Sequence, residues 1–252
     1  MTRALYTGFT GMINEQRRLD IASNNIANAA TTGYKAENVT SQSFEELLTL
    51  KIRDNSEYYV DKPIGNMSLG VRLGEVYTNF GQGPLHETGN DFDLAIEGKG
   101  FFEIREGENI RYTRDGNFKL TKDGYIVDSD GNHLQGQSGD IQIPVDGGGV
   151  SIDVTGRISV DMIPVDTVKL VDFENYDYLE KIADTSYKPV DGAVMLEGDG
   201  VIRQGFTEQS NVNAVSEMVD LIAITRAYEA NQKVIHTEDS LLDKAVNQIG
   251  KL

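Results

Sequence analysis

Side chains that could bind a metal or transfer protons are few and widely separated in this sequence. The three histidines are His86, His133 and His236, and no two of them have the spacing of paired zinc ligands. Glu87 follows His86, but the second histidine of a zinc-protease helix is missing. The absence of cysteine excludes disulfides and thiolate metal sites. These residues therefore give no indication of a metal enzyme.

One group of carboxylates begins like a calcium-binding loop. Asp128, Asp130 and Asn132 have the right spacing for its first ligands. However, Gly131 stands at the fourth position rather than the sixth, and Gly139 replaces the glutamate expected at position twelve. A hairpin turn explains this segment better than a cation site.

Asp91 and Asp93 form a carboxylate pair of the kind that hydrolyses glycans. Residues two apart on a strand share one face, so we expect these two side chains to form a solvated edge instead. The segment 97–100, "EGKG", lacks the glycine spacing and the Ser or Thr of a phosphate-binding loop, and no Gly-x-Ser-x-Gly motif is present. We predict that the protein is not an enzyme and needs no cofactor.

The overall charge limits the possible partners. The 252 residues carry a net charge of −17, which argues against binding to nucleic acid or to anionic lipid. No apolar run is long enough to cross a membrane, and we recognise no cleavable signal peptide. We expect no membrane insertion, and a chain that is cytosolic or leaves the cell without a cleaved signal.

The first structural element that the sequence predicts is a helix over residues 1–33. Its apolar side chains recur at intervals of three and four, as on one face of a helix. They are Leu5, Phe9, Met12, Leu19 and Ile26. Gly8 and Gly11 indicate either a frayed first turn or a close approach to a neighbouring backbone. Gly33 is expected to cap the end of the helix.

A second helix is predicted over residues 213–249, without an internal glycine or proline. It carries two apolar stripes, so it should be buried on two sides. One stripe consists of Val212, Val215, Val219 and Ile222, and the other of Leu221, Ile224, Tyr228, Ile235, Leu242, Ala245 and Ile249. The N-terminal helix can cover one stripe, and further copies of the chain can cover the other. An antiparallel helix pair packed on its own β domain is the alternative.

The middle of the chain reads as β-structure. Apolar and polar residues alternate around Leu94, Ile143 and Ile152, which is typical of half-buried strands. Asp-Gly pairs at residues 115–116, 123–124 and 130–131 indicate hairpin turns, in which both turn residues adopt positive φ. The segment Phe44–Ile52 could form a short helix.

The predicted fold is therefore α+β. Residues 1–33 and 213–252 form a discontinuous helical assembly domain, whose N- and C-terminal helices pair as a coiled-coil-like bundle. Residues 34–83 form an extended connector, and residues 84–212 form a central antiparallel β-rich domain.

Several segments together resemble one known family. "LDIASNNIANAATTGYK" (residues 19–35) and "SNVNAVSEMVDLIAITRAYEANQKVIHTEDSLLDKAVNQI" (210–249) are similar to the terminal signatures of bacterial flagellar axial proteins, the rod and hook subunits. "GPLHETGNDFDLAIEGKGFFEI" (83–104) resembles the first β segment of the same family. Because these motifs span nearly the whole chain in the family's order, the chain is identified as a member.

The resemblance implies a structural subunit that self-assembles through its terminal helices into a hollow helical drive shaft. It also implies type III export and a location in the flagellar basal body, outside the cytoplasmic membrane. The implied partners are further copies of the chain, other axial proteins (proximal rod and hook), surrounding ring proteins and the export apparatus. The long connector is most similar to that of distal-rod subunits, and a proximal-rod or hook-type paralogue remains open. A secreted β-rich module that binds cell-wall glycan is the alternative from another class.

For the subunit interface, the resemblance implies residues on both terminal helices. Asparagines near the end of the first helix would bond to backbone or to neighbouring subunits, or else act as local caps. The expected interface residues are Leu5, Phe9, Met12, Leu19, Asn24, Asn25, Ile26, Asn28, Val215, Val219, Ile222, Tyr228, Ile235 and Leu242.

Overall fold

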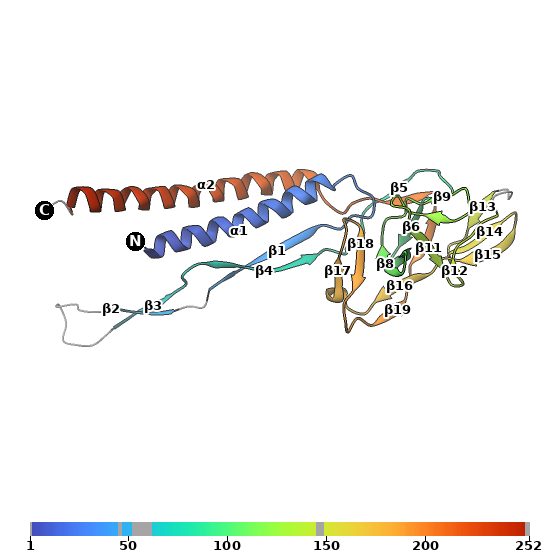
Figure 1. The fold of residues 1–252 in the computed structure, drawn as a ribbon, viewed down its shortest axis with the longest axis horizontal. Helices are drawn as coiled ribbons and strands as arrows, with labels where there is room; N and C mark the ends of the chain where they lie inside the picture. Colours follow the sequence, from blue (N-terminus) through green and yellow to red (C-terminus); the bar gives the residue numbers. More distant parts are fainter. Residues whose placement is uncertain (1, 45–46, 52–61, 145–148, 250–252) are drawn as a thin grey trace. The chain divides into compact units, whose positions relative to one another are not determined.

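A computed structural model describes residues 2–44, 47–51, 62–144 and 149–249. The chain has an α+β fold and divides into two compact units, with the elements shown in Figure 1. The first, which we call the helical unit, combines residues 1–25, 37–77 and 214–252. The second, which we call the β unit, combines residues 26–36 and 78–213. By this division the chain passes between the units after residues 25, 36, 77 and 213.

The helical unit contains the long terminal helices together with paired strands. Its elements are α1 (Thr2–Ala27), β1 (Glu37–Ser43), β2 (Leu47–Lys51), β3 (Lys62–Met67), β4 (Val71–Thr78), α2 (Ala214–Lys244) and a π-helical turn (Ala245–Ile249). β1 pairs with β4, and β2 pairs with β3 in an antiparallel ladder. The second predicted helix is thus present, with a change of winding in its last turn.

The end of the first helix and the short helix differ from prediction. α1 ends at Ala27, because a turn follows in which Thr31 Oγ1 donates to Asn28 Oδ1 at 3.1 Å. Gly33 has a φ of +68°, but its N–H donates to the Glu208 carbonyl at 2.8 Å, so it does not cap α1. The helix expected at Phe44–Ile52 is wrong, because residues 47–51 form strand β2 through pairing with β3. Residues 45, 46 and 52 lie outside the described residues.

The β unit is built almost entirely from short strands. They are β5 (Leu85–Glu87), β6 (Leu94–Glu97), β7 (Phe101–Glu106), β8 (Asn109–Thr113), β9 (Lys119–Leu120), β10 (Ile126–Val127), β11 (His133–Gly136), β12 (Gly139–Asp140), β13 (Val150–Ile152), β14 (Arg157–Val160), β15 (Ile163–Thr167), β16 (Leu170–Phe173), β17 (Leu179–Lys181), β18 (Ser186–Pro189), β19 (Met195–Glu197), β20 (Val201–Gln204) and β21 (Phe206–Glu208). A 3₁₀ turn, Tyr176–Tyr178, precedes β17.

The main sheet of the β unit has ten strands among the described residues. Its path is β17-β18-β8-β7-β11-β10-β9, with β12 beside β11 and with β16 joining β7 to β19. β13, β14 and β15 form a separate antiparallel sheet, while β20 pairs with β6 and β21 with β5. The antiparallel pairing agrees with the predicted β-rich region.

Separate hydrophobic cores pack on the two faces of β7. Phe102 and Ile104 belong to a large core with Leu134 and Ile158, and Phe101 belongs to a smaller, mainly aromatic core. Successive side chains of a strand point to opposite faces, which explains why neighbouring phenylalanines enter different cores. Residues 94–96 of β6 are all buried rather than alternating, so the predicted half-buried strand is covered on both faces at this point.

The turn predictions are only partly met. Gly124 and Gly131 have φ of 84° and 88°, but the aspartate before each does not have positive φ. Among the described residues, the non-glycine positions with positive φ are Asp161 and Met162, at 50° and 67°. They form the two-residue connection between β14 and β15, where Val160 pairs with Ile163.

Gly116 is not a hairpin glycine but a point of close backbone approach. Its carbonyl accepts the Leu94 N–H at 2.9 Å, and a Cβ at this position would lie 1.5 Å from the Leu94 carbonyl oxygen. Glycine is therefore required at this position because no side chain fits, and not because a turn needs positive φ.

Candidate assembly interface

Within the helical unit, α1 and α2 lie side by side and run antiparallel (Figure 1). A Cβ on Gly8 would lie 3.1 Å from Ile235 Cγ1, and a Cβ on Gly11 would lie 2.9 Å from Asn231 Nδ2. The residue number of the contact on α2 decreases as the residue number on α1 increases, so the two helices run antiparallel. Gly8 and Gly11 thus allow close approach of the helices, one of the two interpretations of these residues from the sequence.

The two apolar stripes of α2 differ in their burial. Along the stripe that faces α1, Ile224 is buried with 4% of its surface exposed, and Leu221, Tyr228, Ile235 and Leu242 are half-buried. In the other predicted stripe, Val212 lies before α2 and is half-buried, whereas Val215, Val219 and Ile222 are 71%, 62% and 53% exposed. Met218, on the same side of the helix, is 52% exposed. At 3.6 residues per turn the two stripes lie on opposite sides of the helix. We call the following four residues the exposed stripe: Val215, Met218, Val219 and Ile222.

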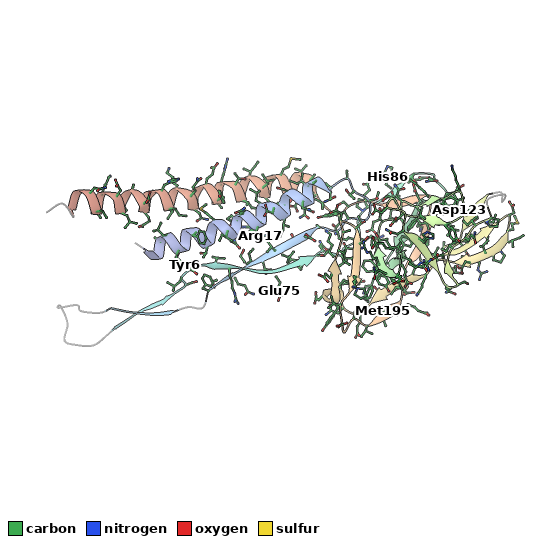
Figure 2. The ribbon with its side chains drawn as sticks, viewed as in Figure 1. Tyr6, Arg17, Glu75, His86, Asp123 and Met195 are labelled. Carbon is green, nitrogen blue, oxygen red and sulfur yellow. The ribbon has the colours of Figure 1, made fainter. Side chains whose placement is uncertain are left out.

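α1 likewise has a covered and an uncovered side. The predicted interface residues Leu5, Met12, Leu19 and Ile26 are half-buried. Phe9, predicted to lie on the same stripe, is 55% exposed. Tyr6 and Ile13 are also exposed, and the ring of Tyr6, labelled in Figure 2, stacks near Phe44 with ring centroids 6.2 Å apart.

The predicted asparagines have different environments. Asn25 is 1% exposed, donates from Nδ2 to the Glu37 carbonyl at 2.8 Å and accepts the Glu37 N–H at 3.0 Å. Asn28 accepts from Thr31 within the turn after α1, and Asn24 lies on the exposed side of the helix. These contacts of Asn25 and Asn28 are made inside one chain, and contacts of the asparagines with neighbouring subunits stay a prediction.

Asn25 also reaches the first turn of α2. It hydrogen-bonds the Glu217 carboxylate, which favours the charged form, but burial has the larger effect and raises the Glu217 pKa. The neighbouring negative charge of Asp220 acts in the same direction as burial. One buried amide therefore contacts α2 as well as the start of β1.

A polar stripe on α1, not identified from the sequence, hydrogen-bonds β1, the start of β4 and the segment just before β4. Thr7 Oγ1 donates to the Leu69 carbonyl at 3.2 Å, Thr10 Oγ1 accepts the N–H at the start of β4 at 3.5 Å, and Asn14 Oδ1 accepts from Ser41 at 3.0 Å. Residues 7, 10 and 14 have helical spacing, and that periodicity of small polar side chains is the signal by which the sequence could have revealed the stripe.

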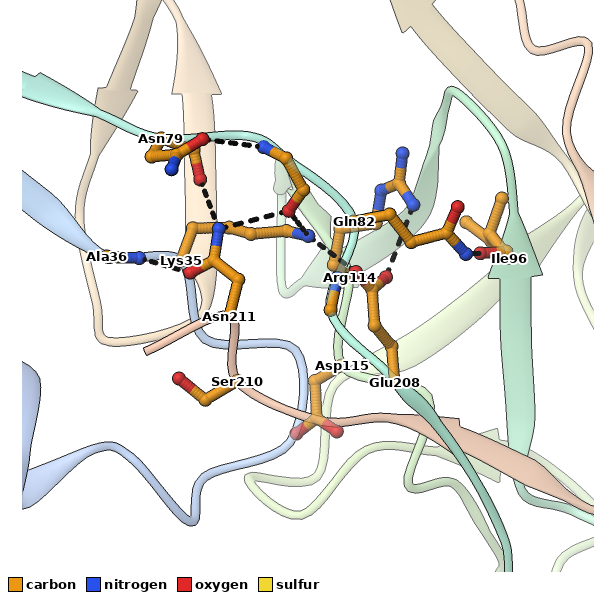
Figure 3. Close-up of polar contacts among 12 residues, drawn as sticks. Lys35, Ala36, Asn79, Gln82, Ile96, Arg114, Asp115, Glu208, Ser210 and Asn211 are labelled. Carbon is orange, nitrogen blue, oxygen red and sulfur yellow. Dashed lines mark hydrogen bonds and ion pairs between the residues drawn. The ribbon is translucent and has the colours of Figure 1, made fainter. Parts of the chain in front are cut away.

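Buried charges meet in the β unit where distant segments of the chain converge (Figure 3). Lys35 Nζ donates to Glu208 Oε1 at 2.5 Å, and Arg114 Nη1 donates to Glu208 Oε2 at 3.2 Å. The three side chains are at most 5% exposed. The Gly83 N–H donates to Glu208 Oε1 at 2.8 Å, and Lys35 Nζ also donates to the Gly81 carbonyl at 2.9 Å.

Asn211 extends this cluster through its side-chain amide. Its Oδ1 accepts the Ala36 N–H at 2.8 Å, and its Nδ2 donates to the carbonyls of Asn79 and Gly81 at 2.7 and 3.0 Å. The Asn79 N–H donates in turn to the Ala36 carbonyl at 2.8 Å. We call the buried Lys35, Arg114 and Glu208, together with the half-buried Asn211, the buried junction.

The buried junction was not predicted from the sequence. Lys35 and Glu208 are 173 positions apart, and no local periodicity relates them. Burial lowers the Lys35 pKa, and the Arg114 charge acts in the same direction, whereas the charge of Glu208 and its hydrogen bond oppose the change.

A half-buried carboxylate, that of Asp115, lies next to the junction. Asp115 accepts a hydrogen bond from Thr32 Oγ1 at 2.6 Å. Burial raises the Asp115 pKa, and the charges of Asp128 and Asp130 raise it further, against the opposing effect of the hydrogen bonds to its charged form. Thr32 thereby ties the segment after α1 to the end of β8.

The residues considered for catalysis or metal binding have structural roles. Asp93 is buried and accepts from Thr88 Oγ1 at 2.6 Å and Asn90 Nδ2 at 3.1 Å, so the expectation that it lies on a solvated edge is wrong. Asp128 accepts the N–H groups of Asp130 and Asn132 at 2.9 and 2.8 Å, which closes a turn.

Two further features concern metals and membranes. Within residues 2–44, 47–51, 62–144 and 149–249, no group of three or more His, Cys, Asp or Glu side chains is placed to hold a metal ion. In the same ranges, neither helix has an apolar segment of the length needed to span a bilayer.

Three family models match successive parts of this chain, and each overlaps a segment that resembles flagellar axial proteins. "Flagella basal body rod protein" matches residues 5–35, "Flagellar hook protein FlgE/F/G D1 domain" residues 95–160, and "Flagellar basal body rod FlgEFG protein C-terminal" residues 203–249. The first and last matches contain most of α1 and the whole of α2, and the middle match contains strands β7 to β14 of the β unit.

Full-length relatives agree with these matches. The flagellar basal-body rod protein FlgG of Bacillus subtilis (strain 168) is 35% identical over 271 residues, which covers 98% of this chain and 99% of the relative. FlgG of Caulobacter vibrioides is 37% identical, and the match covers 98% of this chain and 99% of the relative. The flagellar basal-body rod protein FlgF of Caulobacter vibrioides is 36% identical, with full coverage of both.

Proposed function

Because this chain belongs to the flagellar basal-body rod protein family, we propose that it assembles with copies of itself through α1 and α2 into the rod. The family is structural and not enzymatic, and the chain is a structural rod subunit of the flagellar basal body, outside the cytoplasmic membrane. Self-assembly through the helices would bury the apolar side chains that a single chain leaves exposed on α1 and α2.

The exposed stripe on α2 is the observation that carries the proposal. Val215, Met218, Val219 and Ile222 expose more than half of their surface, on the side of α2 opposite to α1. Burying such side chains contributes about 25 cal/mol per Å² of apolar surface removed from water. A second copy of the chain that covers this stripe would therefore stabilise both the helix and the contact.

The terminal helices form the assembly domain in this proposal. α1 and α2 of one chain pair through the covered stripe in coiled-coil fashion, and copies pack through the exposed stripe and the exposed Phe9. Val215, Val219 and Ile222 then lie between subunits, whereas Tyr228, Ile235 and Leu242 lie between α1 and α2 of the same chain. The proposed boundaries are residues 1–33 and 213–252 for assembly, 34–83 for the connector and 84–212 for the β-rich domain.

The other partners follow from the family. We place this subunit in the distal rod, with proximal-rod and hook proteins as axial neighbours, ring proteins around it and the type III export apparatus as its route. A proximal-rod or hook-type position is the alternative.

Light scattering of the full-length protein as a function of concentration tests the self-assembly. Val219→Asp places a charge in the exposed stripe, and we expect it to abolish concentration-dependent scattering while circular dichroism of the monomer stays unchanged. Lys233→Asp is the matched control, because Lys233 is exposed on the same side of α2 further along the helix. Assembly of Val219→Asp at wild-type concentrations would contradict the proposal.

The place in the rod is tested by imaging hook–basal bodies from a strain that lacks the gene. We expect a rod that stops partway and carries no hook, with a stub whose length separates a distal from a proximal position. A complete rod and hook in this strain would contradict the proposed role.

A further inference from the structure

The buried junction lies where the chain enters and leaves the β unit. Of the four passages between the units, three occur after residues 36, 77 and 213. The junction contacts the β-unit side of each: Lys35 and Ala36 before the first, Asn79 to Gly83 after the second, and Glu208 with Asn211 before the third. These contacts join segments that are far apart in the sequence.

Glu208 and Asn211 each contact both of the other segments, whereas Arg114 contacts Glu208 and the Gly98 carbonyl. Glu208 accepts from Lys35 in the first segment and from the Gly83 N–H in the second. Asn211 bonds Ala36 in the first segment and Asn79 in the second, and the Asn79 N–H bonds back to Ala36. The loss of any one segment therefore removes a hydrogen-bond partner from polar groups of the other two.

Burial makes such a loss unfavourable. Glu208 and Lys35 are at most 1% exposed and Arg114 is 5% exposed, so water cannot replace a missing partner without local opening. A buried charge that loses its partner is strongly destabilising, although an intact buried pair by itself adds little stability. The consequence of this asymmetry is cooperativity between the segments rather than a large stabilisation.

We propose that the buried junction is a coupling device that makes the segments 32–36, 79–83 and 208–211 pack into the rest of the β unit as a single cooperative event. The three points at which the chain passes between the β unit and the helical unit, after residues 36, 77 and 213, are then fixed together or not at all. This property belongs to the single chain and does not depend on rod assembly.

Hydrogen exchange of backbone amides in the full-length monomer tests the coupling. Lys35→Met keeps an unbranched side chain that is one atom shorter and removes its charge. We expect exchange to become about tenfold faster or more at Asn79 and at Gln209, whose N–H groups bond the carbonyls of Ala36 and Pro84. Neither amide bonds the substituted side chain, and neither lies in the segment 32–36 that carries it. Faster exchange at both would therefore show that the other two segments have loosened as well. Faster exchange confined to residues 32–36 would overturn the proposal.

An exposed ion pair of the same unit provides the matched control. Arg203 Nε donates to Glu97 at 2.8 Å, and both side chains are 50% exposed. Arg203→Met removes a cation as Lys35→Met does, but water can solvate the remaining carboxylate. We expect exchange at Asn79 and Gln209 to stay within about twofold of wild type. A change equal to that of Lys35→Met would mean that the response is a general effect of lost charge, and would also overturn the proposal.

A milder variant decides the question if Lys35→Met does not fold. Asn211→Ala removes no charge but breaks the side-chain bonds to Ala36, Asn79 and Gly81. The reporter is then the Gly83 N–H, which bonds Glu208 rather than Asn211. We expect its exchange to accelerate several-fold with that of Ala36. An unchanged Gly83 amide beside a fast-exchanging Ala36 amide would show that the segments dock independently.

Discussion

The β unit and the helical unit bury their apolar side chains to very different degrees. In the β unit, Phe101, Phe102 and Tyr187 are no more than 1% exposed and lie in closed cores. In the helical unit, by contrast, Phe9 and Val215 expose more than half of their surface. The stability of the β unit is therefore contained in one chain, whereas that of the helices depends on further contacts.

This difference reflects how helices and sheets gain stability. A helix satisfies its own backbone hydrogen bonds but needs a packed apolar face to be stable in water. α2 has one such face covered by α1 and another left exposed. The sheets of the β unit have cores on both sides of β7, so most of their apolar side chains already have partners.

The largest effect is expected from a single methyl group in the β unit. In Gly116→Ala the new Cβ would lie 1.5 Å from the Leu94 carbonyl oxygen, so the backbone must shift and the β6 contact must break. We expect a loss of about 4–5 kcal/mol in the free energy of unfolding, measured by denaturant titration of the full chain. Gly107→Ala is the control, because nothing lies within 4 Å there and only its φ of +61° opposes alanine, at about 1–2 kcal/mol. Equal losses in the two variants would remove the argument from close approach.

Truncation of an aromatic side chain in the core should lower the free energy of unfolding somewhat less than Gly116→Ala does. Phe102 is fully buried and packs edge-to-face on Phe118, with ring centroids 5.3 Å apart. Phe102→Ala should lower the free energy of unfolding by about 3–4 kcal/mol, again by denaturant titration. A loss below about 1 kcal/mol would mean that the β unit does not hold the stability assigned to it.

A smaller, pH-dependent effect is expected at Asp115. Its folded pKa lies above its ordinary value, so the folded state binds more protons than the unfolded state between the two pKa values. Stability should therefore fall as pH rises from about 4 through the folded pKa. Asp115→Asn keeps an acceptor for Thr32 and should flatten this fall in a series of unfolding titrations across that range. A pH dependence identical to wild type would contradict the assignment.

The smallest effect on the monomer is expected on the exposed stripe. Ile222 is 53% exposed, so Ile222→Ala should change the free energy of unfolding by no more than about 0.5 kcal/mol. The same substitution should weaken self-assembly, which light scattering measures at matched protein concentrations. Strong destabilisation of the monomer would mean that the stripe is already buried by its own chain, and the contrast between the units would disappear.

Local patterns in the sequence predicted much of this arrangement. The helical periodicity gave both terminal helices, and the two stripes of α2 are distinct in the structure. The end of α1 was missed because Gly33 was taken as the helix cap, although the apolar spacing stops at Ile26 and the asparagine and threonines of residues 28–32 favour a turn.

Contacts between distant segments could not be predicted in this way. Lys35, Arg114 and Glu208 are ordinary surface residue types, and only the tertiary fold buries them together. The strand at residues 47–51 likewise depends on its pairing with β3, which overrides a local sequence compatible with helix. Whether the predicted interface residues contact other subunits remains a prediction, which the Val219→Asp experiment tests.

The division of the chain between its units has a consequence for the order in which they can form. The helical unit includes residues 1–25 as well as residues 214–252, so it lacks one of its two helices until the last segment of the chain is available. The β unit needs nothing beyond residue 213. Whenever the chain is presented from its N-terminus, the β unit can fold first, while α1 still lacks the helix that covers it.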